Sequence, residues 1–171
     1  MKRLLSAVAA IALLTSATAG VANAQPNRVV VNQWGYGNGA AASQNGNRNG
    51  LVINQSGANS YSRGVQDGYD NFLRMDQNGA RNHVSTEQHG TNNFAATGQE
   101  GRRLTADTIQ TGHGNVSGIA QIGNGSRAVA DQDGVNNTSG IIQIGLIYFG
   151  WGVLVAVTSV FFAPRVRRWG G

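Results

Sequence analysis

Glutamine recurs every eleven residues along most of this 171-residue chain, and this spacing constrains the fold more than any other feature. Each repeated glutamine is followed two residues later by a glycine, and the only other glutamine is Gln25. A fixed short period is typical of repeat proteins, in which each unit packs mainly against its neighbours. The repeated glutamines are Gln33, Gln44, Gln55, Gln66, Gln77, Gln88, Gln99, Gln110, Gln121, Gln132 and Gln143. The glycines that follow them are Gly35, Gly46, Gly57, Gly68, Gly79, Gly90, Gly101, Gly112, Gly123, Gly134 and Gly145.

An eleven-residue period also occurs in right-handed coiled coils. The composition argues against a helix here, because glycine and asparagine cost a helix interior up to about 1 kcal/mol per residue. Segments such as 28–33 and 51–55 instead alternate in the way that half-buried strands do. We therefore predict a strand of about six residues in each unit, followed by a turn of about five in which Gly and Asn adopt the left-handed conformation.

Alternation within a strand assigns each side chain to one face. If the glutamine points inward, the residues two and four positions before it also point inward, and all of these are small or apolar and uncharged. The charged residues of the strands have the opposite parity; they are Arg28, Arg63, Arg74, Asp76, Glu87, Asp107, Arg127 and Asp131. The sequence therefore predicts a thin, dry core between two polar outer faces.

Two consecutive units make one 22-residue coil of strand, turn, strand and turn. Coils stacked at about 4.8 Å pair every strand with its equivalents in the neighbouring coils. Alternate glutamines then form two columns, in which stacked amides bond one another and avoid the cost of several kcal/mol for an unpaired buried amide. We expect an all-β fold, a two-sheet β-solenoid of about five coils with in-register Gln and Asn ladders.

Asparagine stands six residues before every glutamine of the column that begins with Gln33; these residues are Asn27, Asn49, Asn71, Asn93, Asn115 and Asn137. The run from Ser60 through Gln66, Gly68 and Asn71 to Gln77 resembles the curlin repeat in residue types and spacing. In this phase, a half-unit at 27–37 is followed by repeats over 38–59, 60–81, 82–103, 104–125 and 126–147. Leu104 and Tyr148 depart from the family pattern at a polar turn position, and residues 148–171 do not resemble the family.

The resemblance implies a secreted structural subunit of curli, the functional amyloid fibres of bacterial biofilm matrix. Its implied partners are other curlin subunits and an outer-membrane export pore, and the resemblance leaves open whether the chain is a major subunit or a fibre nucleator. The alternative class is a monomeric or membrane-tethered β-solenoid that acts as a binding or adhesin module. The outward positions form no regular array of one residue type, which favours the fibre subunit.

The two ends of the chain differ from the repeats. A positive start at Lys2, an apolar segment over 4–19 and a small-residue cleavage site at 22–24 predict a secretory signal peptide over residues 1–24, with an uncleaved membrane anchor as the alternative. The repeat region then spans 25–147, and residues 148–171 form a hydrophobic and basic tail. The uncharged segment 146–163 is long enough for a membrane span. A shifted reading frame, or an apolar segment that docks on the last coil, would give the same composition.

The net charge of +5 comes from the ends of the chain, where the basic residues are Lys2, Arg3, Arg165, Arg167 and Arg168. Between these ends, the chain has eight arginines and eight carboxylates, so this part has no net charge. A nucleic-acid surface needs clustered cations, so we predict no nucleic-acid partner.

The reactive residues are scattered over the repeats. His83 is expected at an exposed strand position, and His89 and His113 are expected in turns, in three different units. The carboxylates keep no fixed spacing, and the chain has no cysteine. We therefore predict no catalytic site, no cofactor and no metal site.

Overall fold

The computed structural model describes residues 12–14 and 27–145 of the chain. Most of the predicted signal peptide, and the whole of the predicted tail and candidate membrane segment from residue 146 onward, lie outside the described residues. Among the residues that are described, no helix has the length and apolar character needed to cross a membrane.

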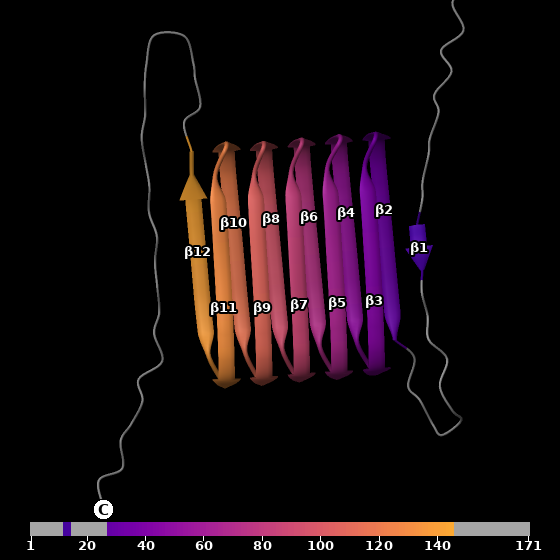
Figure 1. Cartoon of the computed structure of the whole chain (residues 1–171), viewed down its shortest axis with the longest axis vertical. Helices are drawn as coiled ribbons and strands as arrows, with labels where there is room; N and C mark the ends of the chain where they lie inside the picture. Colours follow the sequence, from indigo (N-terminus) through magenta and orange to yellow (C-terminus); the bar gives the residue numbers. More distant parts are fainter. Residues whose placement is uncertain (1–11, 15–26, 146–171) are drawn as a thin grey trace, which may run out of the picture.

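The described residues form strands of nearly uniform length joined by short turns (Figure 1). The first is a three-residue strand, β1 (Ala12–Leu14). The others are β2 (Arg28–Tyr36), β3 (Gly39–Asn47), β4 (Gly50–Ala58), β5 (Tyr61–Tyr69), β6 (Phe72–Ala80), β7 (His83–Thr91), β8 (Phe94–Arg102), β9 (Thr105–His113), β10 (Val116–Asn124), β11 (Arg127–Val135) and β12 (Thr138–Ile144).

The strands form two parallel sheets that wind around one axis. The odd sheet has the order β1-β3-β5-β7-β9-β11, and the even sheet has the order β12-β10-β8-β6-β4-β2. Each strand from β4 to β12 pairs with the strand 22 residues earlier, so that Gln55 lies beside Gln33 and Gln66 lies beside Gln44. The expected two-sheet β-solenoid of about five coils is confirmed, with glutamine aligned on glutamine in both sheets.

The turns are shorter than the sequence predicts. Strands β2 to β11 have nine residues, and each includes the repeat glycine and the residue after it. Only two residues separate consecutive repeat strands, for example Arg48 and Asn49 between β3 and β4. The prediction of six-residue strands and five-residue turns is wrong because the glycine, although its φ is positive, still pairs in register with the glycine of the next coil.

The left-handed residue of each turn also differs from the prediction. It is the residue before the turn asparagine, as in Arg48 (φ 58°), Asp70 (φ 58°) and Asn92 (φ 56°). The asparagines that follow are buried and use their side chains in hydrogen bonds. His89 and His113, expected in turns, lie in β7 and β9.

The core lies between the sheets and consists of the residues two and four positions before each glutamine. Residue size is matched across it: a Cβ on Gly64 in the odd sheet would lie 2.5 Å from Leu51 and 2.9 Å from Leu73 of the even sheet. Leu51, Leu73 and Met75 are fully buried. Glycine at position 64 therefore leaves room for three large side chains from the facing sheet.

Two threonines in this core have buried hydroxyls without a hydrogen-bond partner, namely Thr86 and Thr97. An unpaired buried hydroxyl costs about 1–3 kcal/mol. Because valine has nearly the same shape, we expect Thr86→Val and Thr97→Val each to raise the free energy of unfolding by about 1 kcal/mol. Chemical denaturation would measure this, and the exposed Thr111→Val is the control, with a change within about 0.5 kcal/mol. A lower free energy of unfolding in Thr86→Val would contradict the prediction.

Candidate assembly interface: side-chain ladders and strand edges

The repeat glutamines form one hydrogen-bonded ladder in each sheet. In the even sheet, the side-chain amide of Gln33 donates to the carbonyl oxygen of Gln55 at 2.6 Å, and the chain of bonds continues to Gln143. In the odd sheet, the ladder runs from Gln44 to Gln132 with N–O distances of 2.7 to 2.9 Å. Every bond has the same direction, with the donor on the earlier coil. The ladder therefore has a free acceptor at one end of the solenoid and a free donor at the other.

The second amide hydrogen of the glutamine side chain connects the two sheets. Gln55 in β4 donates to the backbone oxygen of Gly39 in β3 at 3.0 Å, and Gln88 in β7 donates to that of Phe72 in β6 at 3.1 Å. The same bond across 16 residues recurs along the solenoid. One glutamine thus holds its own sheet together along the axis and also fastens it to the facing sheet.

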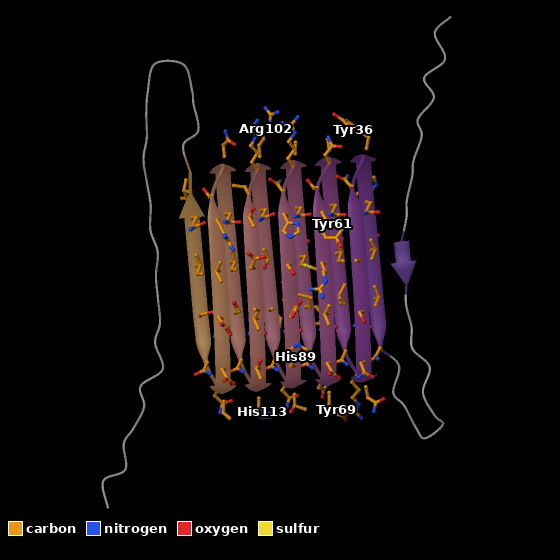
Figure 2. All side chains as sticks on the ribbon, viewed as in Figure 1. Tyr36, Tyr61, Tyr69, His89, Arg102 and His113 are labelled. Carbon is orange, nitrogen blue, oxygen red and sulfur yellow. The ribbon has the colours of Figure 1, made fainter. Side chains whose placement is uncertain are left out.

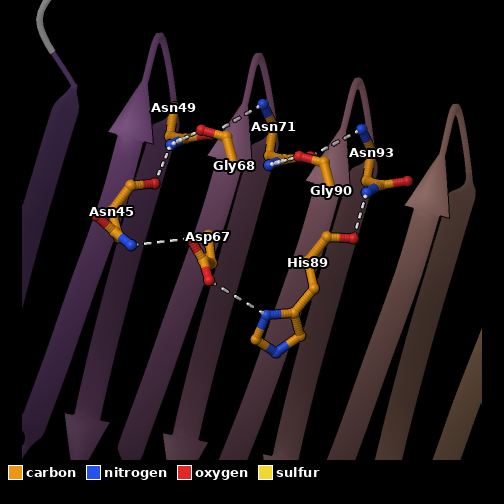
Figure 3. A network of polar contacts seen from close by, with 8 residues as sticks. All are labelled: Asn45, Asn49, Asp67, Gly68, Asn71, His89, Gly90 and Asn93. Atoms are coloured by element: carbon orange, nitrogen blue, oxygen red, sulfur yellow. Dashed lines mark hydrogen bonds and ion pairs between the residues drawn. The ribbon is translucent and has the colours of Figure 1, made fainter.

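The turn asparagines form a further ladder along one corner of the solenoid (Figure 3). The backbone N–H of Asn71 donates to the Oδ1 of Asn49 at 3.1 Å, and that of Asn93 donates to the Oδ1 of Asn71 at 3.0 Å. The side-chain amide of Asn49 donates to the backbone oxygens of Asn45, four residues earlier, and Gly68, in the next coil, both at 3.0 Å. An aspartate or leucine could not make these donor contacts, which explains the residue type at this buried position.

The other corner has a mixed ladder. Ser60 N–H donates to Asn38 Oδ1, Asn82 N–H donates to Ser60 Oγ, and Leu104 N–H donates to Asn82 Oδ1. Leu104 is fully buried there and has no side-chain acceptor to offer to the next coil. Leu104, which departs from the repeat pattern in the sequence, therefore interrupts this ladder by one hydrogen bond.

The repeat glycines allow the coils to approach closely. Gly79 has a φ of 118°, and a Cβ at this position would lie 1.9 Å from the backbone oxygen of Gly101 in the next coil. The same clash, at 1.8 to 2.0 Å, would occur at Gly35, Gly46, Gly57, Gly68, Gly90, Gly101 and Gly112. Both the backbone conformation and the space at these positions require glycine.

The outer faces carry charges that are matched along the axis. Arg63 in β5 pairs with Glu87 in β7, and Arg127 lies 3.3 Å from Asp107. Within β6, the Asp76 carboxylate accepts a hydrogen bond from Arg74 at 2.7 Å and raises the pKa of the Arg74 guanidinium. Because these pairs are exposed, water screens them and each contributes little, so they permit in-register stacking rather than drive it.

Aromatic side chains stack along the outer faces as well. The Tyr61 and His83 rings are 5.4 Å apart, and the Phe72 and Phe94 rings are 5.5 Å apart. Figure 2 shows Tyr36 at one end of the strands and Tyr69 at the other, because the two sheets run in opposite directions. These rings give the outer wall of the solenoid half-exposed apolar area for contact with other surfaces.

A shallow groove of about 380 Å³ crosses the outer face of the even sheet. It runs along the axis between the residues just before and just after the glutamines, from Trp34 to Ile122, and it includes Gly98 and Glu100. Within the described part of the chain, no three His, Cys, Asp or Glu side chains gather in a way that could hold a metal ion. Two carboxylates line the groove, Asp76 and Glu100, and Asp76 is paired with Arg74.

Among the described residues, the last strand of each sheet has no further strand beside it, apart from the short β1. β2 forms the first edge of the even sheet, and β12 and β11 form the last edges of the even and odd sheets. At the remaining edge, β1 pairs with only three residues of β3, Ala40 to Ala42. Unpaired edges of this kind readily add another strand.

The structure thus brings the sequence-predicted glutamines, turn asparagines and glycines of the described coils into continuous columns. The sequence alone does not predict three further features. Ser62 bridges the two sheets, because it accepts from Gln55 at 3.1 Å and donates to Gln77 at 2.8 Å. The left-handed turn residue and the unpaired threonine hydroxyls were also missed, and only the frequency of Asn, Asp and Gly at the turn position could have indicated the first of these.

Residues 101–134 match the family model described as Curlin associated repeat. The match runs from the end of β8 to the end of β11, and the same eleven-residue pattern continues on both sides of it. No curated protein and no solved structure matches the chain.

Proposed function

We propose that this chain, which belongs to the curlin repeat family, is a secreted structural subunit of curli-type amyloid fibres that serves adhesion and biofilm matrix. The family match and the β-solenoid together fit a curli-type structural subunit. In this proposal, residues 1–24 direct export, an outer-membrane pore passes the chain, and other curlin subunits are its partners.

One observation carries the proposal: both ends of the solenoid present open strand edges that continue the fold itself. At the last coil, the side-chain amide of Gln143 donates to the backbone oxygen of Arg127 at 2.8 Å, and its second hydrogen has no acceptor among the described residues. At the first coil, the carbonyl oxygens of Gln33 and Gln44 are the acceptors that such a donor needs. A second subunit therefore extends both glutamine ladders as well as both sheets.

The ladder supports addition in one direction. All its bonds run from the earlier coil to the later one, so that a head-to-tail contact joins a donor end to an acceptor end. A head-to-head contact would place two acceptor ends together. Stacked strands, matched charges and a dry core then repeat through the fibre at the spacing that they have within one chain.

The proposal predicts fibres with a cross-β pattern. The purified chain should form filaments that bind thioflavin T and give a meridional reflection near 4.8 Å. Negative-stain microscopy and fibre diffraction would test this. A chain that stays monomeric at high concentration would contradict the fibre role and favour the monomeric adhesin module instead.

A further inference from the structure

The number of repeat strands is odd, and this has a consequence for the contact between chains. Over residues 28–144, the even sheet has the six strands β2, β4, β6, β8, β10 and β12, whereas the odd sheet has the five repeat strands β3, β5, β7, β9 and β11. The chain therefore contains five and a half coils. Each end of the solenoid therefore has a step of half a coil, with β12 beyond β11 and β2 before β3.

A second copy added without rotation cannot fill this step. Its β2 would pair with β12 in the even sheet, and its β3 would then face β11 across the place of one missing strand. The two strands would lie at about twice the 4.8 Å spacing that backbone hydrogen bonds require. Nine residues of β11 would keep unpaired backbone groups inside the fibre, which is costly wherever water is excluded.

We propose that successive chains in the fibre are related by a half-turn about its axis, so that β2 of one chain pairs with β11 of the preceding chain and β3 pairs with β12. This rests on the proposed fibre function. The half-turn exchanges the two sheets at each junction. It is possible because strands of both sheets carry the same eleven-residue motif, with Gln and Gly in identical positions.

The half-turn continues every ladder of the solenoid. Gln132 donates to Gln33 of the next chain and Gln143 donates to Gln44, in the direction that all bonds within the chain have. Asn137 offers its Oδ1 to the backbone N–H of Asn38, as Asn115 does to Asn137 at 3.0 Å.

The outer faces also match after the half-turn. Asn32 then lies beside Asp131, an amide and carboxylate pair like Asn54 with Asp76 at 2.6 Å and Asn45 with Asp67 at 3.0 Å, except that the carboxylate is on the earlier coil at the junction. These two contacts follow the strands in the same order, with the amide on one coil and the carboxylate on the adjacent one. Without rotation, Asn32 would lie beside the apolar Ile142.

Exposed apolar side chains meet in the same arrangement. Tyr36 and Val135, 67% and 62% exposed in the single chain, become neighbours, and Val30 lies beside Val129. Arg28 comes next to Arg127, whose charge is already offset by Asp107. The contact thus covers apolar area that the isolated solenoid leaves in water.

The edge of β3 that this contact uses already takes a parallel strand in the structure. β1 pairs there with Ala40 to Ala42, and β12 of the preceding chain would place Ser139 to Ile141 opposite the same residues (Figure 1). β1 lies inside the predicted signal peptide, so removal of residues 1–24 frees this edge. The half-turn therefore belongs to the processed chain.

Cysteine cross-linking distinguishes the two arrangements, because the natural chain has no cysteine. Paired residues on adjacent strands lie about 4.8 Å apart, within the range that a disulfide spans. Asn32→Cys with Asp131→Cys tests the half-turn, and Asn32→Cys with Ile142→Cys tests stacking without rotation. The full-length variants would be exported by a bacterium, and the extracellular fibres would be oxidised and run on a non-reducing gel.

We expect the first pair to convert the monomer band into a ladder of multimers, and the second pair to leave it as monomer. Cross-linking through the second pair alone would overturn the half-turn while leaving the fibre function intact. Fibres that cross-link in neither variant would also overturn it, as expected if another segment covers β11. If the natural chain forms no fibres at all, the proposed function itself fails, and thioflavin T binding and microscopy report this separately.

Discussion

Replacing Gly79 by alanine is expected to prevent β6 and β8 from pairing and to abolish fibre formation. The new Cβ would lie 1.9 Å from the backbone oxygen of Gly101, so one coil would have to move away from the next. The φ of 118° at this position adds strain for any residue with a side chain. Because the opposing atom belongs to the backbone, no rotation of a flexible side chain can relieve the contact.

The control for Gly79→Ala is another glycine of the same sheet. A Cβ on Gly98, in β8, would have no heavy atom within 4 Å, and Gly98 does not have a positive φ. We expect Gly98→Ala to leave the thermal midpoint and the rate of fibre growth close to those of the natural chain. Circular dichroism and thioflavin T kinetics would compare the two variants, and equal behaviour would show that the glycine column does not set the spacing of the coils.

The faces of the strands and their register could be predicted from the sequence because both depend on one periodicity. An eleven-residue unit is odd, but its turn restores the phase, so Gln55 and Gln66 of successive units both point inward. Charges such as Arg63 and Glu87 fall on the opposite parity and lie outside. A shift by one residue would have buried these charges, which is why the register was strongly specified.

The length of the turns could not be predicted because glycine occurs both at the ends of strands and within strands that continue to pair. At Gly79, positive φ accompanies continued strand pairing, whereas sequence patterns associate glycine with the end of a strand. The left-handed residue is Arg48 in one turn, Asn59 in the next and Asp70 in the one after, so that position has no single residue type to indicate it. Most of these turn residues are Gly, Asn or Asp, which accept the left-handed conformation, whereas Arg48, Arg81 and Arg103 adopt it against their local preference.

The partners of buried polar groups also required the structure. The alternation of inward and outward residues predicts correctly that Thr86 and Ser62 both lie on the inner face. Only the three-dimensional arrangement shows that Ser62 bonds Gln55 and Gln77, whereas the Thr86 hydroxyl has no partner. The hydrogen-bond partners of these side chains lie on other strands and on the facing sheet. The periodicity of one strand therefore cannot predict them.

Replacing Gln88 by alanine is expected to cause a large loss of stability. Its side chain accepts from Gln66 at 2.8 Å and donates to Gln110 at 2.9 Å and to the backbone oxygen of Phe72 at 3.1 Å. Alanine removes one hydrogen-bond partner from each of these three groups, and an unsatisfied buried donor or acceptor costs about 1–3 kcal/mol. We therefore expect the free energy of unfolding to fall by about 3–5 kcal/mol, and fibre growth to slow markedly.

His89 is the matched control for Gln88→Ala, because it is the next residue in β7 and its side chain points outward. Its ring is exposed and lies 4.0 Å from the Asp67 carboxylate, a contact at the surface that contributes little (Figure 3). His89→Ala should therefore change the free energy of unfolding by less than about 0.5 kcal/mol. Chemical denaturation of the two variants, followed by thioflavin T kinetics, would measure both effects. If the two substitutions destabilised the chain equally, the fold would depend on backbone pairing alone, and the amide ladders would have no part in holding the coils together.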